Sequence, residues 1–371
     1  MNFLALILAG ITALFAAAIL TPMTARLAIL LGVIDRPSER KVSDRKGIPL
    51  LGGLAVVLGC FLGFFAYRLV AESSDFALVK NQLTSFMAGG TLLVLVGAWD
   101  DRFELGAWQK LPFQLLASVI AINGGFVIDY FTNPFTLTTS PLPVWLSWMI
   151  TLGWIVVVTN AMNLIDGLDG LTAGTGVIIA GTLGVICFQA GQAGGLLIAV
   201  VIMGALVGFL PFNFPPARIF LGDAGALFIG FALALVAVEG YRKAALLTFV
   251  VPLLALAVPL LDTGLSIIRR IRAGKGIFSA DKMHIHHLLL AREGSHRRAV
   301  LWLYFQTLCF SIIALSFSDL RGYSAYIFLG AVILLTLRMV RNLGVMGVEE
   351  YEADSDGSPK PATLPPEEPS K

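Results

Sequence analysis

Carboxylate side chains gather at the end of one apolar segment of the chain. Asp100 and Asp101 are adjacent there, and Glu104 follows one helical turn later. Neighbouring carboxylates repel one another, and near a helix C-terminus they also oppose the macrodipole. A divalent cation or a basic substrate network is the usual compensation for such a group. The pair therefore predicts a metal or phosphate site, with a solvated acidic loop as the alternative.

A second polar segment carries Asn160, Asn163, Asp166 and Asp169 at a strict spacing of three, with two glycines among them. In a regular α-helix each three-residue step lags by roughly 60°, so the four side chains would not share one face. The glycines favour a break in the helix instead. Non-helical backbone at membrane depth is tolerated where it lines a polar cavity. The segment predicts a site for a hydrophilic substrate or a metal, with a structural network between helices as the alternative.

A third motif carries Asp223, which lies between two glycines at the start of a further apolar run. It could be an N-cap, which accepts hydrogen bonds from free backbone N–H groups at a helix start. Together with the other acidic loops, a Mg²⁺ ligand is the favoured interpretation, because Mg²⁺ commonly binds through one or two protein oxygens plus substrate phosphates.

The largest basic loop contains His284, His286 and His287, together with Arg270 and its neighbours. Their spacing matches none of the common Cys/His zinc patterns, although a zinc site remains an alternative. Imidazoles beside arginines suit a phosphate or diphosphate. A basic patch at the membrane surface also remains open.

The segment from Asp35 to Lys46 is rich in charge. Its functional interpretation is a landing site for an anionic lipid headgroup, and the alternative is that its basic residues only set membrane orientation.

These residues are positioned by a very apolar chain. Of its 371 residues 57% are hydrophobic and 13% charged, which excludes an ordinary soluble domain. A spanning helix needs about 20 mostly apolar residues. The pattern predicts an all-α polytopic membrane protein of about eleven transmembrane helices, centred near Leu14, Leu58, Leu92, Val119, Trp154, Ile179, Met203, Ala232, Leu254, Phe310 and Val332. Residues 1–347 form one transmembrane domain, and 348–371 form an acidic, proline-rich tail expected to be disordered.

Charge asymmetry sets the expected orientation. Most of the 26 lysines and arginines fall in the loops that carry the polar motifs, whereas the other side holds only Arg68, Lys80, Arg242, Lys243 and Arg321. The positive-inside rule places the motif-bearing loops and the C-terminus in the cytoplasm and the N-terminus outside. The first apolar run is read as a span, since no cleavage site follows it. The three cysteines fall inside apolar runs and are expected to act as small hydrophobes.

Taken together, the motifs resemble the polyprenyl-phosphate N-acetylhexosamine-1-phosphate transferase family (glycosyltransferase family 4), in its WecA/TagO-like branch. The residues that carry the resemblance are Asp-Asp-Arg-Phe-Glu at 100–104, Asn-Ala-Met-Asn-Leu-Ile-Asp-Gly-Leu-Asp-Gly at 160–170, Gly-Asp-Ala-Gly at 222–225 and His-Ile-His-His at 284–287. Ser43 departs from the histidine that many such sequences carry.

The resemblance implies a bacterial inner-membrane enzyme with a cytoplasmic active site, a Mg²⁺ cofactor for which Mn²⁺ could substitute, and UDP-GlcNAc and undecaprenyl phosphate as substrates. By similarity, Asn163 and Asp223 would hold the metal. Asp100 and Asp101 would be the catalytic residues at the acceptor phosphate, and whether one of them acts as a base or as a nucleophile stays open. The remaining residues would bind substrate: Asp166 and Asp169 on the nucleotide side, Arg270, His284, His286 and His287 at the sugar phosphate, Asp35 and Lys46 at the lipid, and Asn160 beside them.

The implied reaction produces undecaprenyl-diphospho-GlcNAc and UMP, the first step of lipid-linked glycan synthesis such as O-antigen or other cell-wall polymers. Another UDP-sugar, such as UDP-GalNAc or UDP-MurNAc-pentapeptide, remains an alternative donor. A secondary transporter is a second alternative, disfavoured because the polar clusters crowd one face and no second half of the chain repeats them. No nucleic-acid partner is expected, and a homodimer remains open.

Overall fold

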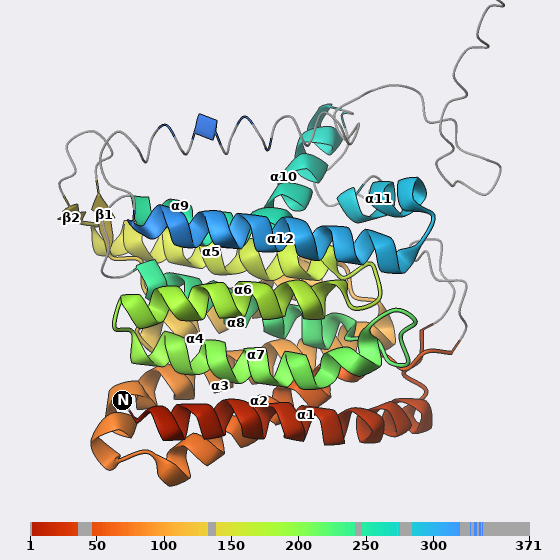
Figure 1. Ribbon diagram of the computed structural model, residues 1–371, viewed down its shortest axis with the longest axis horizontal. Helices are drawn as coiled ribbons and strands as arrows, with labels where there is room; N and C mark the ends of the chain where they lie inside the picture. Colours follow the sequence, from red (N-terminus) through yellow and green to blue (C-terminus); the bar gives the residue numbers. More distant parts are fainter. Residues whose placement is uncertain are drawn as a thin grey trace, which may run out of the picture.

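The computed structural model describes residues 2–35, 47–132, 139–241, 247–272, 274 and 284–319, together with single positions between 327 and 336. These residues form an α-helical bundle with one short β-hairpin (Figure 1). The helices are α1 (Phe3–Leu31), α2 (Gly52–Val70), α3 (Ser73–Phe103), α4 (Ala107–Asn123), α5 (Val144–Ile165), α6 (Leu171–Gln189), α7 (Ala193–Asn213), α8 (Gly222–Tyr241), α9 (Leu247–Ala255), α10 (Ala257–Arg272), α11 (Ile285–Glu293) and α12 (His296–Asp319).

The all-α polytopic prediction is confirmed. Eight of the described helices are long and apolar enough to cross a membrane, namely α1, α2, α3, α5, α6, α7, α8 and α12. The run near Val119 became α4, which is shorter than these, and the run near Val332 lies mainly outside the described residues, as does the expected tail. The hairpin pairs β1 (Tyr130–Thr132) antiparallel with β2 (Thr139–Pro141).

The apolar run near Leu254 is two helices rather than the single helix expected. α9 ends at Ala255 and α10 begins at Ala257. Pro259 accounts for the break, because it has no N–H to donate to the Ala255 carbonyl and its ring crowds that oxygen. In Figure 1 α10 turns away from the layer that contains α9.

Helix α8 forms the centre of the bundle. From Ala224 to Val238 its side chains are apolar all round, the pattern of a helix buried on every side. It packs against α2, α3, α5, α6 and α7, and Leu227, Phe228 and Phe231 are fully buried. The N-terminal end of this central helix therefore lies among the ends of several other helices.

Small residues let the outer helices approach closely, as is typical of membrane bundles. A side chain on Gly59 of α2 would come within 3.0 Å of the Ala13 carbonyl oxygen and of the Ala17 side chain, both in α1. On α7, a side chain on Gly208 would come within 2.1 Å of the Leu14 carbonyl oxygen. The helices α1, α2 and α7 thus pack backbone against backbone and hold the start of α2 beside the start of α8.

Candidate active site

The motif-bearing loops meet at one end of the bundle. The Arg102 guanidinium donates to the Gly32 carbonyl over 3.1 Å, and the Phe220 N–H donates to the Pro49 carbonyl over 2.8 Å. The Ala217 N–H donates to the Asp169 carboxylate over 2.9 Å. Segments far apart in the sequence are therefore joined at one end of the bundle.

The start of α8 is held against α3 by Asp101. Its two carboxylate oxygens accept the backbone N–H groups of Asp223 (2.8 Å) and Ala224 (3.3 Å). A carboxylate at this position satisfies free N–H groups and complements the positive end of the helix dipole. The capping role considered for Asp223 is thus taken by Asp101, which leaves the Asp223 side chain available for another function.

Glycines make this approach sterically possible. A side chain on Gly97 of α3 would come within 2.4 Å of the Ala224 backbone, and one on Gly53 of α2 within 2.2 Å of the Gly225 nitrogen. Gly222 has φ of 72°, a left-handed conformation that glycine adopts without strain. Helices α2, α3 and α8 therefore come together at the Gly-Asp-Ala-Gly segment, residues 222–225.

Lys110 joins two of the carboxylates. Its Nζ lies 2.5 Å from Asp100 Oδ2 and 2.8 Å from Asp223 Oδ2. The Lys110 and Asp100 side chains are 13% and 7% exposed, whereas that of Asp223 is 34% exposed. Asp100 also accepts the Leu105 N–H through its other oxygen. The Asp223 carboxylate is therefore more exposed than that of Asp100, and Lys110 offsets the repulsion between the two.

The two asparagines of α5 occupy different settings. The Asn163 side chain faces the Asp223 carboxylate. Asn160 lies one turn earlier and exchanges hydrogen bonds with Gln114 of α4, at 2.6 Å and 3.2 Å. Gln114 is buried, and it is absent from the sequence-based set. Asn160 thus takes part in the structural amide network that was the alternative interpretation, and its substrate-binding role stays a prediction.

The loop between α5 and α6 carries Asp166 and Asp169. The helix continues to Ile165, the backbone leaves helical geometry at Asp166, and Gly170 takes φ of 74° before α6 begins. The break predicted from the glycines is therefore a tight loop at the bundle end. Its partner is the segment before α8, since Asp169 accepts the Ala217 N–H. This loop lies at the same bundle end as Asp223.

The basic region is built around His284. Its Nδ1 lies 3.1 Å from Asp262 Oδ2 and 3.2 Å from Ser266 Oγ, and the other Asp262 oxygen accepts the Ile285 N–H over 2.7 Å. Arg269 donates to Ser266 over 2.9 Å. Asp262 and His284 are both buried, so a buried polar cluster joins α10 to the start of α11.

The other predicted substrate residues lie as follows. Asp35 is buried, and its backbone pairs with Ile48 and Gly47 at the start of α2. Arg270 is buried near the end of α10. Lys46 lies outside the described residues, and His286 and His287 lie in α11 with side chains outside the described set. Cys60 and Cys187 are buried and Cys309 is partly buried, as expected of small hydrophobes.

The donor set around Asp223 fits Mg²⁺. The described residues contain no group of three or more His, Cys, Asp or Glu side chains arranged for a metal. Mg²⁺ does not need one, because it usually keeps several waters and binds through one or two protein oxygens plus substrate phosphates. A partly exposed Asp223 carboxylate with the Asn163 amide beside it supplies that number of oxygens.

Sequence reasoning missed Lys110, Gln114, Asp262 and Tyr304 as site residues. Lys110 was counted only as part of the charge asymmetry. A polar side chain within an apolar helix was the available signal for Gln114 and Asp262, because such a residue in a membrane helix needs a partner. Tyr304, whose hydroxyl donates to the Gly170 carbonyl over 2.5 Å, gave no signal, since tyrosine is ordinary in such helices.

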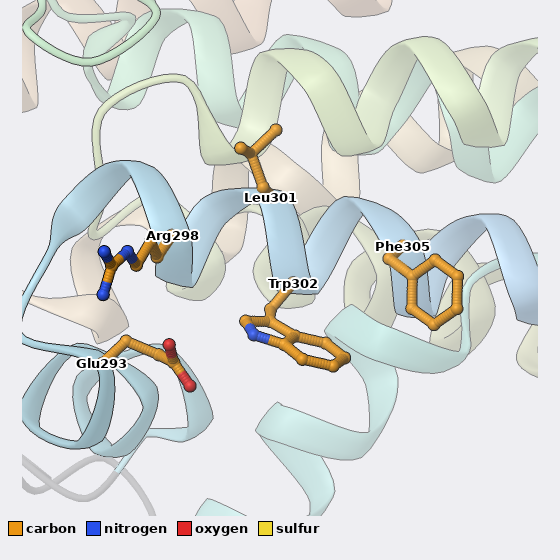
Figure 2. A pocket seen from close by; sticks show the side chains of 5 residues that line it. All are labelled: Glu293, Arg298, Leu301, Trp302 and Phe305. Carbon is orange, nitrogen blue, oxygen red and sulfur yellow. The ribbon is translucent and has the colours of Figure 1, made fainter.

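An apolar pocket of about 350 Å³ lies beside this end of the bundle, on α12 and the end of α11. Figure 2 shows Trp302 and Phe305 pointing to the same side of α12, with Glu293 and Arg298 at one end and Leu301 directed away from them. Trp302 and Phe305 are 48% and 56% exposed. The pocket lies apart from the contacts that join the acidic loops.

Comparison with known proteins agrees with this arrangement. The sequence model of glycosyl transferase family 4 matches residues 83–241, from within α3 to the end of α8. A probable undecaprenyl-phosphate N-acetylglucosaminyl 1-phosphate transferase of Bacillus subtilis is 38% identical over 311 residues, covering 84% of each chain. A decaprenyl-phosphate N-acetylglucosaminephosphotransferase of Mycobacterium tuberculosis is 34% identical, covering 95% of this chain and 92% of the other. An undecaprenyl-phosphate alpha-N-acetylglucosaminyl 1-phosphate transferase of Escherichia coli K12 is 27% identical over 81% of this chain and 80% of the other. The chain belongs to the polyprenyl-phosphate N-acetylhexosamine-1-phosphate transferases of glycosyl transferase family 4.

Proposed function

We propose that this chain transfers N-acetylglucosamine 1-phosphate from UDP-GlcNAc to undecaprenyl phosphate, releasing UMP. The observation that carries the proposal is the meeting of Asp100, Lys110 and Asp223 at the bundle end, with the α5–α6 loop nearby. Relatives named for transfer of this sugar phosphate to a polyprenyl phosphate support the choice of sugar and carrier. The product would start lipid-linked cell-surface glycan synthesis.

In the proposed reaction an oxygen of the lipid phosphate attacks the β-phosphorus of UDP-GlcNAc. A new P–O bond forms as the bond from the β-phosphorus to the bridging oxygen breaks, and that oxygen leaves on UMP. Phosphoryl transfer of this kind depends mostly on positioning and charge stabilisation. No base is required, because the lipid phosphate is already an anionic nucleophile.

The residues of the chain divide the work of positioning. Asp223 and Asn163 would hold Mg²⁺, which when bound neutralises charge on the diphosphate. Lys110 keeps the side chains of Asp100 and Asp223 together and adds a positive charge next to the phosphates. Asp101 fixes the helix that carries Asp223. Asp166 and Asp169 would face the nucleotide, and His284 with Arg270 the sugar phosphate.

The proposed site lies on the cytoplasmic face of the bacterial inner membrane. UDP-sugars are cytoplasmic metabolites, and the basic loops obey the positive-inside rule only in this orientation. The lipid acceptor reaches the same surface from the bilayer.

The test is transfer of radiolabel from UDP-GlcNAc to undecaprenyl phosphate by the purified full-length protein in detergent. We expect lipid-linked label and an equal amount of UMP, both lost with EDTA and restored by Mg²⁺. Label from UDP-GalNAc alone would change the donor and keep the reaction. Transfer that persists in EDTA would overturn the metal assignment. Folded protein without transfer from any UDP-sugar would overturn the proposed function.

A further inference from the structure

A partly buried contact connects α12 to the loop that bears Asp166 and Asp169. The Tyr304 hydroxyl donates to the Gly170 carbonyl over 2.5 Å, across 134 residues of sequence. The same carbonyl accepts the first hydrogen bond of α6, from the Gly174 N–H over 2.9 Å. Tyr304 therefore holds the residue at which the acidic loop becomes a helix.

The tyrosine ring occupies a space that the sequence of α6 leaves empty. A side chain on Gly174 would come within 2.0 Å of the Tyr304 ring, and one on Gly170 within 3.3 Å of its hydroxyl oxygen. Gly170 also has a positive φ, so both its backbone conformation and the nearby Tyr304 hydroxyl disfavour any larger residue at this position. The two glycines leave a space that one aromatic side chain fills, and we call this space the Tyr304 seat. An ordinary contact between lipid-facing helices would not need such a space.

A second contact from α12 reaches the loop before α8. The Arg297 guanidinium lies 5.8 Å from the centre of the Phe214 ring, within the range of a cation–π interaction. Arg297 and Tyr304 are seven residues apart and so lie on one face of α12. The Phe214 backbone in turn lies next to Gly170.

The two loops are also tied to each other, through the Ala217 N–H and the Asp169 carboxylate. Three contacts thus form a closed circuit: α12 to Gly170, Asp169 to Ala217, and Phe214 back to α12. Helix α12 lies outside residues 83–241, where the family model matches, and runs beside α6 (Figure 1).

We propose that Tyr304 is a positioning residue for donor binding. Its side chain fixes the loop carrying Asp166 and Asp169 relative to the segment that leads to Asp223, and Arg297 supports the same arrangement. Tyr304 has no chemical part in the transfer. The inference deepens the proposed function, since it takes these two aspartates to face the nucleotide.

The first experiment compares Tyr304→Phe with the wild type in the full-length protein, with transfer kinetics and hydrogen exchange measured on the same samples. Loss of one hydrogen bond of ordinary strength should raise KM for UDP-GlcNAc about fivefold, with KM for undecaprenyl phosphate and kcat unchanged. Exchange should become faster in the peptide containing residues 168–174.

Tyr67→Phe is the matched control. Tyr67 is a fully buried tyrosine of α2 at the opposite end of the bundle, and within the described part of the chain its hydroxyl has no hydrogen-bond partner. This variant loses the same atom and should leave both KM values and exchange at 168–174 unchanged. An equal effect of both variants would overturn the positioning role.

A second pair of variants tests the seat itself. Gly174→Ala forces the Tyr304 ring away and should raise KM for UDP-GlcNAc more than Tyr304→Phe does. Adding Tyr304→Leu makes room for the new methyl group, so the double variant should regain the thermal stability of the wild type and keep the raised KM. Recovery of both properties would show that Tyr304 only fills space. If the wild type transfers nothing, the proposed function fails, and hydrogen exchange still decides whether Tyr304 fixes the loop.

Discussion

At one end of the bundle charged side chains tie one helix to the next, whereas at the other end the ties come mainly from hydroxyls and aromatic rings. Lys110 joins Asp100 to Asp223 at the first end. At the second, Thr151 accepts the Ile128 N–H over 2.9 Å, Ser147 donates to the Ile128 carbonyl over 2.7 Å, and rings such as Phe3 and Phe188 pack edge to face.

The difference shows what packing alone requires. Charge is sparser among the described residues of the second end, where Asp75 accepts the Asn2 N–H over 2.8 Å and Glu239 is buried near the end of α8, with no lysine that joins two carboxylates. Buried charges in membrane proteins are costly and usually functional. The concentration of carboxylates around one lysine at the first end is therefore best explained by chemistry with phosphates, and the following variants test that contrast.

The largest effect is expected for Asp223→Asn. The substitution keeps the size of the side chain and removes the carboxylate that is proposed to hold Mg²⁺, which is 34% exposed. Transfer should fall about 10³-fold, the upper range for loss of one preorganised electrostatic group. The matched control is Asp75→Asn, because Asp75 is likewise an acidic residue in the first turn of a helix, at the opposite end. Similar losses in both variants would remove the distinction between the two ends.

Lys110→Met should have the second largest effect. It leaves Asp100 and Asp223 facing each other without a counter-charge, and removing one partner of a largely buried pair costs about 3 kcal/mol. We expect the free energy of unfolding in detergent to fall by about that amount and transfer by about 100-fold. Lys80→Met at the other end removes an exposed charge and should change neither property.

A double variant separates the two roles of Lys110. Adding Asp100→Asn to Lys110→Met relieves the repulsion, so stability should recover while transfer stays low. Recovery of transfer with stability would mean that Lys110 acts only on folding.

The same contrast explains which parts of the structure the sequence could predict. Asp100, Asp101 and Asp223 follow or precede apolar runs directly, so alternation of the spans was enough to bring them to one end. The hydrogen bonds were not predictable in this way. Asp101 caps α8, which begins 122 residues later in the sequence. The cap depends on the close approach that Gly53, Gly97 and Gly222 allow, and the sequence alone does not show which backbones touch.

The helices show a similar division. Apolar runs were sufficient to predict an all-α bundle, because length and hydropathy identify a span. The break between α9 and α10 was missed, since a hydropathy pattern averages over Pro259 and its missing N–H. That break matters for function, because α10 places Asp262 where it meets His284.

Asp262→Asn should have the third largest effect. Asp262 accepts hydrogen bonds from the Ile285 N–H and contacts His284 Nδ1, so it fixes the orientation of that ring. Loss of a hydrogen bond to a charged group should raise KM for UDP-GlcNAc about tenfold. His284→Ala should raise it at least as much. Unchanged donor kinetics in both variants would favour the surface-patch interpretation of the basic loop.

Asp101→Asn is expected to have the smallest effect, and it compares the two ends of the bundle directly. The asparagine can still accept one of the two α8 N–H groups, so the cost is part of a cap and its charge, about 1 kcal/mol of unfolding free energy. Transfer should fall about fivefold, because α8 carries Asp223. Thr151→Val removes the acceptor of the Ile128 N–H at the other end and should cost a similar amount of stability, about 1 kcal/mol, with no change in transfer. If both variants lose activity in proportion to stability, the two ends of the bundle would contribute to transfer only by stabilising the fold. If only Asp101→Asn loses transfer, the position of the α8 N-terminus itself sets the rate.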